Sequence, residues 1–258
     1  MREEIIEYAK KIAVEAGGIL NNKFGKVKKI DFKGEINIVT EADCISQDFI
    51  KKSIKEKFPD HSILSEEDLE IHSSSPYRWI VDPLDGTTNF AHGLPIFAVS
   101  IALEFDGEIF AGVVYNPVLK ELFWAEKGRG AYLGRKRIKV SETESLSRAL
   151  LATGFPYDIR EDPNNNLNHF SKFALKAQAI RRLGSAALDL CYVACGRFDG
   201  FWELKLFPWD VSAGILIVEE AGGKITDFKG FPTDIYSKEI VASNGKIHDE
   251  MIEVLNEK

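Results

Sequence analysis

The feature that most constrains the fold is a change in the pattern of apolar residues about halfway along the 258-residue chain. Between residues 95 and 140, short β-branched and aromatic runs alternate with glycine-containing turns, a pattern typical of antiparallel sheet. From residue 149 to 255, strand-like runs alternate with segments of helical spacing, which predicts an α/β layer. The polar stretch 141–147 separates the two patterns. We therefore predict an α+β fold whose halves, residues 1–145 and 146–258, form one compact unit.

Individual elements follow from the same patterns. Apolar residues at helical spacing predict helices, and short β-rich runs between polar turns predict strands. The predicted helices cover residues 3–24, 42–58, 167–177, 185–195, 209–221 and 246–255; the predicted strands cover 36–40, 61–65, 77–82, 97–105, 108–115, 121–126, 131–140, 149–152, 179–183, 200–204 and 240–242.

The run W-I-V-D-P-L-D-G-T-T at residues 79–88 ends an apolar strand with two carboxylates and turns towards a helix. Pro83 cannot donate to a β-ladder, so it should end the strand and place Asp82 at its carboxyl end. Pro83 and Gly86 then let the backbone turn, so that Asp82, Asp85 and the Leu84 carbonyl converge. Such oxygen ligands suit Mg²⁺ or Mn²⁺ rather than zinc. Taken alone, a run of this kind more often forms a solvated Asp-Pro turn before an N-capping Thr.

Further carboxylates are available to complete a metal site. The chain offers Asp43, Glu66, Glu67 and Asp210 near the ends of predicted elements. Asp210 follows Pro208 in the first turn of a predicted helix, where the helix dipole favours an anion. An acidic residue in this position is also an ordinary helix start.

Charge and cysteine usage exclude several classes of protein. A net charge of −7 argues against a general nucleic-acid surface, and the basic run at residues 26–29 fits a solvated loop. No apolar run approaches the ~20 residues that span a bilayer, and the first residues lack the apolar segment of a signal peptide. The histidines and Cys44, Cys191 and Cys195 show no zinc-ligand spacing. We expect a cytoplasmic protein with reduced thiols.

Two long motifs resemble the signatures of the inositol monophosphatase family. They are W-I-V-D-P-L-D-G-T-T-N-F-A-H at residues 79–92 and W-D-V-S-A-G-I-L-I-V-E-E-A-G-G at residues 209–223. The segments V-T-E-A-D at 39–43, S-E-E at 65–67 and L-G-S-A-A at 183–187 match at the family's relative positions. The resemblance thus covers essentially the whole chain. It implies the layered αβαβα sandwich of the Mg²⁺-dependent, lithium-sensitive sugar phosphatases, and a homodimer.

The resemblance also implies a set of metal ligands. Glu66, Asp82 and the Leu84 carbonyl would hold one Mg²⁺, and Asp82, Asp85 and Asp210 would hold a second. Glu66 would be the protein ligand of a weaker third ion, and Mn²⁺ is a possible substitute. Two divalent ions about 3.5–4 Å apart can activate a water molecule and stabilise both the entering and the leaving oxygen.

Catalytic roles are implied for Asp43, Thr87 and Glu66. Asp43 would orient the hydroxyl of Thr87, and Thr87 would position the attacking water and help to remove its proton. The expected reaction is in-line attack of metal-activated water on a phosphate monoester. Glu67 adjoins Glu66, so the choice between these two carboxylates stays open.

Substrate contacts are predicted at two helix starts, where backbone N–H groups can meet phosphate charge. The second start, at residues 184–186, also fits a plain N-capped helix. Glu203 matches the family glutamate that bonds a hydroxyl of inositol, although it could equally be a strand-edge charge. The predicted substrate-binding residues are Leu84, Asp85, Gly86, Thr87, Gly184, Ser185, Ala186, Glu203 and Asp210.

The predicted function is Mg²⁺-dependent hydrolysis of a polyol or sugar monophosphate, with inositol 1-phosphate as the first candidate. The alternatives are a fructose-1,6-bisphosphatase or a nucleotide 3′-phosphatase on the same fold, or a regulatory binding role in transcription. Arg181, Arg182 and Arg197 are the nearest cations for a second phosphate, but each also fits a surface or ion-pair residue. A small phosphate ester is the expected partner, without membrane or nucleic acid.

Three positions concern loop geometry. Lys33 resembles a residue of a family loop that closes over the metals. Ser65 and Asn37 stand where the family more often has Gly and Asp, which removes no ligand but leaves the affinity of the weakest metal site open.

Overall fold

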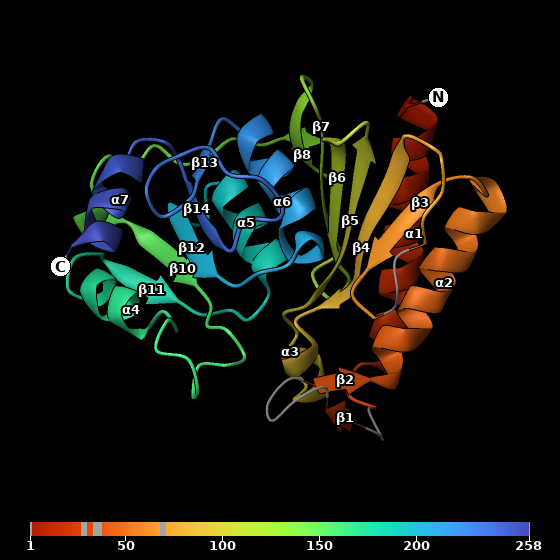
Figure 1. The fold of residues 1–258 in the computed structure, drawn as a ribbon, viewed down its shortest axis with the longest axis horizontal. Helices are drawn as coiled ribbons and strands as arrows, with labels where there is room; N and C mark the ends of the chain where they lie inside the picture. Colours follow the sequence, from red (N-terminus) through yellow and green to blue (C-terminus); the bar gives the residue numbers. More distant parts are fainter. Residues whose placement is uncertain (1, 27–29, 33–37, 68–70, 258) are drawn as a thin grey trace.

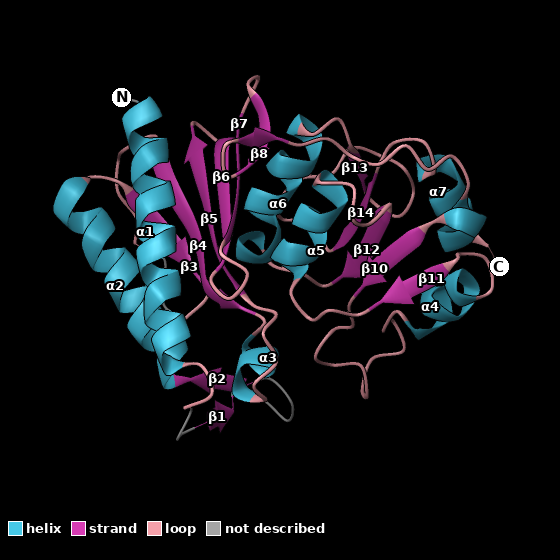
Figure 2. Ribbon diagram, turned by 180° about the vertical axis from the view of Figure 1, so that it is seen from behind, coloured by secondary structure: helices cyan, strands magenta, loops and turns pink. Residues whose placement is uncertain are grey.

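The computed structural model describes residues 2–26, 30–32, 38–67 and 71–257, and these form five layers (Figure 1). A helix pair covers the outer face of a first sheet, a central helix pair separates the two sheets, and a third pair covers the second sheet. The αβαβα sandwich is confirmed, and the view from behind shows the same layers (Figure 2). The helices are α1 (Arg2–Lys23) and α2 (Glu41–Lys57) on the first sheet, α5 (Ala186–Ala194) and α6 (Pro208–Glu220) in the centre, and α4 (Leu167–Ala174) and α7 (His248–Asn256) on the second sheet.

The first sheet has seven strands in the order β3-β4-β5-β6-β7-β8-β9. Strands β3 and β4 run parallel, and the following neighbours pair antiparallel, as the turn-rich pattern predicts. Residues 131–140 form two short strands instead of one, because a turn at Gly134, with φ of 59°, reverses the chain. The strands are β3 (Ser62–Ser65), β4 (Tyr77–Asp85), β5 (Ala98–Phe105), β6 (Glu108–Asn116), β7 (Glu121–Glu126), β8 (Gly130–Leu133) and β9 (Lys136–Arg137).

Strand β4 shows that one prediction was wrong. Pro83 does not end the strand, because β4 continues to Asp85, which faces Ala98 on β5. The register shifts between Asp82 and Asp85, as expected where a proline lacks the N–H that the ladder needs. The Pro83 carbonyl instead accepts a hydrogen bond from the Ser46 hydroxyl of α2, 2.9 Å away. Both carboxylates therefore lie within an irregular, buried strand end.

The second sheet has the order β11-β10-β12-β14-β13. Strand β10 pairs in parallel with β11 and β12, whereas β14 pairs antiparallel with β12 and β13. Strand β13 was not predicted. The strands are β10 (Leu150–Thr153), β11 (Ala179–Arg181), β12 (Gly200–Leu204), β13 (Lys224–Thr226) and β14 (Glu239–Ser243). A separate pair joins β1 (Ile30–Phe32) and β2 (Ile38–Thr40).

Helices α5 and α6 are buried on most of their surface, which their nearly uninterrupted apolar sequences explain. Two glycines let this central layer pack closely. A Cβ added to Gly214 of α6 would lie 2.7 Å from the Cβ of Leu190 on α5. A Cβ added to Gly112 of β6 would lie 2.7 Å from the carbonyl oxygen of Ala213. Larger residues would force the layers apart.

Other features are smaller. Helix α4 ends at Ala174, three residues before the predicted end. A 3₁₀ turn at Leu146–Arg148 overlaps the end of the polar stretch 141–147. All three cysteines are free thiols, with Cys191 buried. Among the described residues, no helix combines the length and apolar character needed to cross a bilayer. Lys33 and Asn37 lie outside the described residues.

Candidate active site

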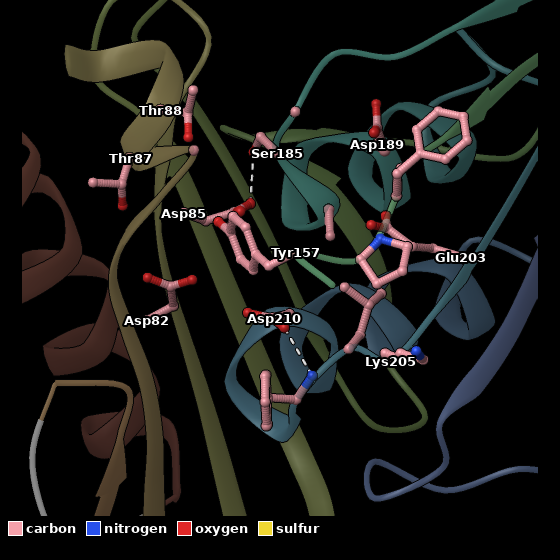
Figure 3. Close-up of a pocket in the computed structure, with 18 of the residues that line it drawn as sticks. Asp82, Asp85, Thr87, Thr88, Tyr157, Ser185, Asp189, Glu203, Lys205 and Asp210 are labelled. Carbon is pink, nitrogen blue, oxygen red and sulfur yellow. Dashed lines mark hydrogen bonds between the residues drawn. The ribbon is translucent and has the colours of Figure 1, made fainter. Parts of the chain in front are cut away.

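A cavity of about 380 Å³ opens where the end of β4, the starts of α5 and α6 and the end of β12 meet (Figure 3). The start of the short helix α3 (Thr87–Ala91) and the loop after β10 complete its wall. All of the predicted metal and substrate residues line this cavity. They are Glu66, Asp82, Leu84, Asp85, Gly86, Thr87, Gly184, Ser185, Ala186, Glu203 and Asp210. The structure thus brings together side chains that lie up to 144 positions apart, from Glu66 to Asp210.

Asp43 lies behind the cavity wall and holds Thr87. Its Oδ1 accepts a 2.8 Å hydrogen bond from the Thr87 hydroxyl. Its Oδ2 accepts from the backbone N–H of Thr40 at 2.8 Å and from the Thr40 hydroxyl at 2.6 Å. These bonds form a capping box at the start of α2, so local helix chemistry fixes the carboxylate. Burial raises the pKa of Asp43, and the hydrogen bonds from Thr40 and Thr87 oppose this shift.

Asp82 lies in the interior of the site, with 1% of its surface exposed. Its Oδ1 accepts a 2.9 Å hydrogen bond from the backbone N–H of Leu84. Burial raises the pKa of Asp82 well above its usual range, and the negative charges of Glu66, Asp85 and Asp210 raise it further. Four carboxylates therefore share one weakly solvated space.

Asp85 links β4 to α5. Its Oδ2 accepts hydrogen bonds from the Ser185 hydroxyl at 2.6 Å and from the backbone N–H of Ala187 at 2.8 Å. Burial raises the pKa of Asp85 to about 6, although these hydrogen bonds work in the opposite direction. The first backbone donors of α5 thus bind Asp85, and the helix start positions a carboxylate.

Asp210 lies in the first turn of α6, as the sequence predicts. Pro208 is the first residue of this helix, and Asp210 Oδ2 accepts a 2.8 Å hydrogen bond from the backbone N–H of Phe207. Burial raises the pKa of Asp210 well above its usual range, and repulsion from Asp85, Glu66 and Glu203 adds to the shift. Its carboxylate faces the same cavity as those of β4 (Figure 3).

The donor set fits a hard cation by its chemistry. The cavity lining offers carboxylate and carbonyl oxygens but neither His nor Cys. Asp82, Asp85 and Asp210 each use one oxygen to accept from backbone N–H groups. Across the part of the chain that the structure describes, no three Asp, Glu, His or Cys side chains lie close enough to form a ready-made metal site.

Two glycines let the starts of α3 and α5 approach each other. Gly86 has φ of 92°, and an added Cβ would lie 2.9 Å from the Ile96 carbonyl oxygen and 3.2 Å from that of Gly184. Gly184 has φ of 81°. The Asn89 side chain ties the two segments together, since it donates to the Leu183 carbonyl at 2.7 Å. Only glycine suits such positions without strain.

Glu203 lies on the opposite side of the cavity from Asp82 (Figure 3). Burial raises the pKa of Glu203 to about 8; Asp85 adds to the shift, and Arg182 opposes it. Gly154 leaves room for its carboxylate, because an added Cβ there would lie 2.0 Å from Glu203 Oε1. Asp189 of α5 lines the same side and was not predicted. A single acidic residue in the apolar run A-A-L-D-L-C-Y-V-A was the available signal.

The three candidate arginines differ in their position relative to the cavity. Arg197 forms an ion pair with Glu121, with Nη1 2.7 Å from Oε2, and it does not line the cavity. Arg181 is exposed and donates to the backbone of Ile180. Only Arg182 among the three lines the cavity. Glu67 also lies outside the lining, whereas Glu66 belongs to it.

A loop at the cavity mouth carries Tyr157, which was not predicted either. Lys205 holds this loop, because its Nζ lies 2.7 Å from Asp158 Oδ2 and 2.6 Å from Asp162 Oδ2. Lys205 has φ of 63°, an uncommon value for a residue with a side chain. The end of β12 therefore positions both Glu203 and the loop.

Comparisons with known proteins identify relatives along the whole chain. The model of the inositol monophosphatase family matches residues 1–258. An inositol-1-monophosphatase from Synechocystis sp. is 45% identical over 97% of this chain and 88% of its own length. A fructose-1,6-bisphosphatase/inositol-1-monophosphatase from Aquifex aeolicus is 44% identical over 98% of this chain and 95% of its own length. The crystal structure of extragenic suppressor protein suhB from Bartonella henselae has a TM-score of 0.94 at 42% identity, covering 98% of this chain and 99% of that one.

Proposed function

This chain belongs to the inositol monophosphatase family and is a phosphoric monoester hydrolase, and we propose that it hydrolyses the monophosphate of a polyol in a Mg²⁺-dependent reaction. Inositol 1-phosphate is the leading candidate substrate. The supporting observation is the two-ended cavity, which has oxygen ligands beside Thr87 at one end and the carboxylate of Glu203 at the other.

Glu66, Asp82, Asp85, Asp210 and the Leu84 carbonyl would hold the Mg²⁺ ions, with Mn²⁺ as a possible substitute. When bound, the cations neutralise phosphate charge and lower the pKa of water. The raised pKa values of Asp82 and Asp210 support this assignment, since both shifts reflect buried negative charge that a cation would compensate.

Thr87 and Asp43 would prepare the attacking water. The Thr87 hydroxyl has one proton, which points to Asp43 Oδ1 at 2.8 Å or to the Leu84 carbonyl at 3.0 Å. With that proton engaged, the lone pairs of Oγ1 can accept a hydrogen bond from water. The oxygen of that water would then be held for in-line attack on phosphorus. As the water proton passes to Thr87 Oγ1, the Thr87 hydroxyl proton would pass to Asp43 Oδ1, and the bond from phosphorus to the ester oxygen would break, so that the alcohol leaves with a proton from solvent.

The leaving alcohol would lie against Glu203. An ionised carboxylate can only accept hydrogen bonds, whereas a protonated carboxyl group can both accept and donate, so Glu203 can contact a polyol in either state. The shape set by Gly154 keeps this carboxylate at the cavity wall. These contacts would orient the ester and leave the phosphate at the Asp82 end.

Fructose 1,6-bisphosphate is the second candidate substrate. It is favoured by the Aquifex aeolicus relative, whose name gives both activities, and by Arg182, which could contact a second phosphate. Because Arg182, which is exposed, would be the arginine that contacts the second phosphate, we rank the bisphosphate below the polyol monophosphate.

A substrate panel in the presence and absence of Mg²⁺ tests the proposal. Phosphate release is measured from inositol 1-phosphate, fructose 1,6-bisphosphate and a nucleoside 3′-phosphate, with EDTA as the metal-free arm. The proposal expects the highest kcat/KM for inositol 1-phosphate and loss of turnover in EDTA. Undiminished turnover in EDTA would refute the metal assignment, and no turnover of inositol 1-phosphate would refute the substrate.

We also propose, from membership of the family, a homodimer that Li⁺ inhibits. Light scattering should give twice the 28.9 kDa chain mass, and a lithium titration should lower kcat. A monomer in solution would reject the proposed dimer. Activity that lithium leaves unchanged would reject the proposed inhibition.

A further inference from the structure

Asp189 is an acidic residue in an otherwise apolar helix of the central layer. Helix α5 has the sequence A-A-L-D-L-C-Y-V-A, and only 1% of the surface of Asp189 is exposed. Its Oδ1 is buried and has no hydrogen-bond partner. A buried carboxylate oxygen without a partner is destabilising, so folding alone does not explain this residue.

The start of α5 does not supply the missing partner. The Ser185 hydroxyl and the backbone N–H of Ala187 donate to Asp85, and the backbone N–H of Leu188 donates to Ser185 Oγ. The helix dipole favours an anion near this end, but a dipole does not satisfy an individual oxygen. The partner of Asp189 must therefore come from elsewhere.

The position of Asp189 indicates where that partner lies. Asp189 lines the cavity on the Glu203 side, away from Asp82 (Figure 3). Glu203 is held beside it against Gly154, and Arg182 is the cation whose charge acts on both carboxyl groups. This end of the cavity is thus rich in hydrogen-bond acceptors, and its complement is a group with several donors, such as adjacent hydroxyls.

We propose that Asp189 is a specificity-determining residue that, together with Glu203, accepts hydrogen bonds from hydroxyl groups of the leaving alcohol. This inference rests on the proposed function and deepens it, because it selects polyol monophosphates over esters that lack hydroxyls. It also disfavours a second phosphate at this end, where two carboxyl groups face one arginine.

The test compares kcat/KM for inositol 1-phosphate with kcat/KM for phenyl phosphate, an ester whose alcohol has no further hydroxyl. Asp189→Ala should lower the ratio of these two values by about 10- to 100-fold, mainly through KM for inositol 1-phosphate, since a hydrogen bond to a charged group is lost. Asp189→Asn retains one acceptor and should lower the ratio less. A double variant with Glu203→Gln should lose less than the product of the single effects, because both residues contact the same alcohol.

Asp199→Asn provides the matched control. Asp199 is also buried, but it accepts from the Ser141 hydroxyl and the Leu150 backbone outside the cavity. This variant should lower the Tm without changing the substrate ratio. An unchanged ratio in Asp189→Asn and Asp189→Ala overturns the inference, as does an equal loss on both esters. Where Asp189→Ala fails to fold, the ratio measured for Asp189→Asn decides. A wild-type enzyme that cleaves phenyl phosphate but not inositol 1-phosphate overturns the proposed substrate instead.

Discussion

The Thr87 hydroxyl lies at the contact between two elements beside the cavity. Its Oγ1 contacts Asp43 from α2 and the Leu84 carbonyl of β4, so two elements determine its orientation. The adjacent Asp82 is buried among three other carboxylates. The Thr87 hydroxyl and the Asp82 charge can therefore be tested separately by substitution.

Replacement of Thr87 by Val should lower kcat by about 10²-fold or more, because the proton acceptor for water is lost while the shape is retained. Thr87→Ser keeps the hydroxyl and should lose much less. Both variants should bind Mg²⁺ as the wild type does, which a thermal shift can show. Equal activity of the Val and Ser variants would contradict the role of the hydroxyl.

Asp82→Asn should abolish measurable activity while the fold stays intact, since it removes a charge without changing the volume of the side chain. We expect a loss of at least about 10²- to 10³-fold in kcat. In EDTA the variant should have a higher Tm than the wild type, because one buried carboxylate has been removed. Circular dichroism and phosphate release measure the two effects, and retained activity would show that Asp82 is not a ligand.

At the scale of elements, the contact between the starts of α3 and α5 closes one side of the cavity. Gly86→Ala should lower the free energy of unfolding by about 1–2 kcal/mol from the positive φ alone, with a further loss from the contacts at Ile96 and Gly184. Gly107→Ala is the control, since Gly107 has φ of 83° but an added Cβ meets nothing within 4 Å. Denaturant unfolding should show a larger loss of stability for Gly86→Ala than for Gly107→Ala. Only Gly86→Ala should also lower kcat. Similar losses for both variants would exclude a steric role.

His248 connects α7 to the edge of the second sheet. Its Nε2 lies 2.9 Å from Thr226 Oγ1 on β13, and its Nδ1 lies 2.9 Å from Ser243 Oγ on β14. Burial lowers the pKa of His248 to about 4, and the charge of Lys224 adds to this shift. The folded state therefore keeps the ring neutral at a pH where the unfolded chain, with a pKa near 6.5, binds a proton.

The stability that this neutral ring contributes should be complete above about pH 6.5 and should fall as the pH drops towards 4, by up to about 3 kcal/mol. Urea unfolding at several pH values measures this slope. His248→Gln, which cannot gain a proton, should show a shallower slope over the same range. Parallel slopes for both proteins would place the acid sensitivity elsewhere.

At the scale of the whole molecule, the cavity depends on contacts between the two halves of the chain. Asp85 of the first sheet bonds to Ser185 and Ala187 of the central layer, and Asn89 bonds to the Leu183 carbonyl. We propose from these contacts that residues 1–145 and 146–258 act as one unit. Mg²⁺ bound among their carboxylates should then stabilise the entire chain.

Mg²⁺ at about 100 times its Kd should stabilise the protein by about 2.7 kcal/mol for each site. For a chain of this size that corresponds to a Tm increase of roughly 5–10 °C per site over the value in EDTA. Asp82→Asn should reduce the increase, whereas Asp199→Asn should retain it. An identical increase in Asp82→Asn would indicate that Mg²⁺ binds elsewhere.

The sequence by itself determined the order of most helices and strands and most of the residues that line the cavity. Apolar spacing is a local property, so it predicted α1, α2 and the alternation of the second half. The two signature motifs predicted Asp82, Asp85, Thr87 and Asp210, which the structure brings to one cavity. It did not determine where β4 ends, because Pro83 interrupts the ladder while Ser46 of α2 satisfies its carbonyl.

Only the tertiary structure decided which polar residues face the cavity. Arg182 lines it, whereas Arg197 pairs with Glu121, although sequence treats the two alike. Asp189 joins Glu203 only because α5 is buried between the two sheets. Whether a polar residue faces the cavity depends on contacts between residues far apart in the chain, and its free-energy cost depends on how deeply it is buried. The spacing of residues in the sequence specifies neither the contacts nor the burial.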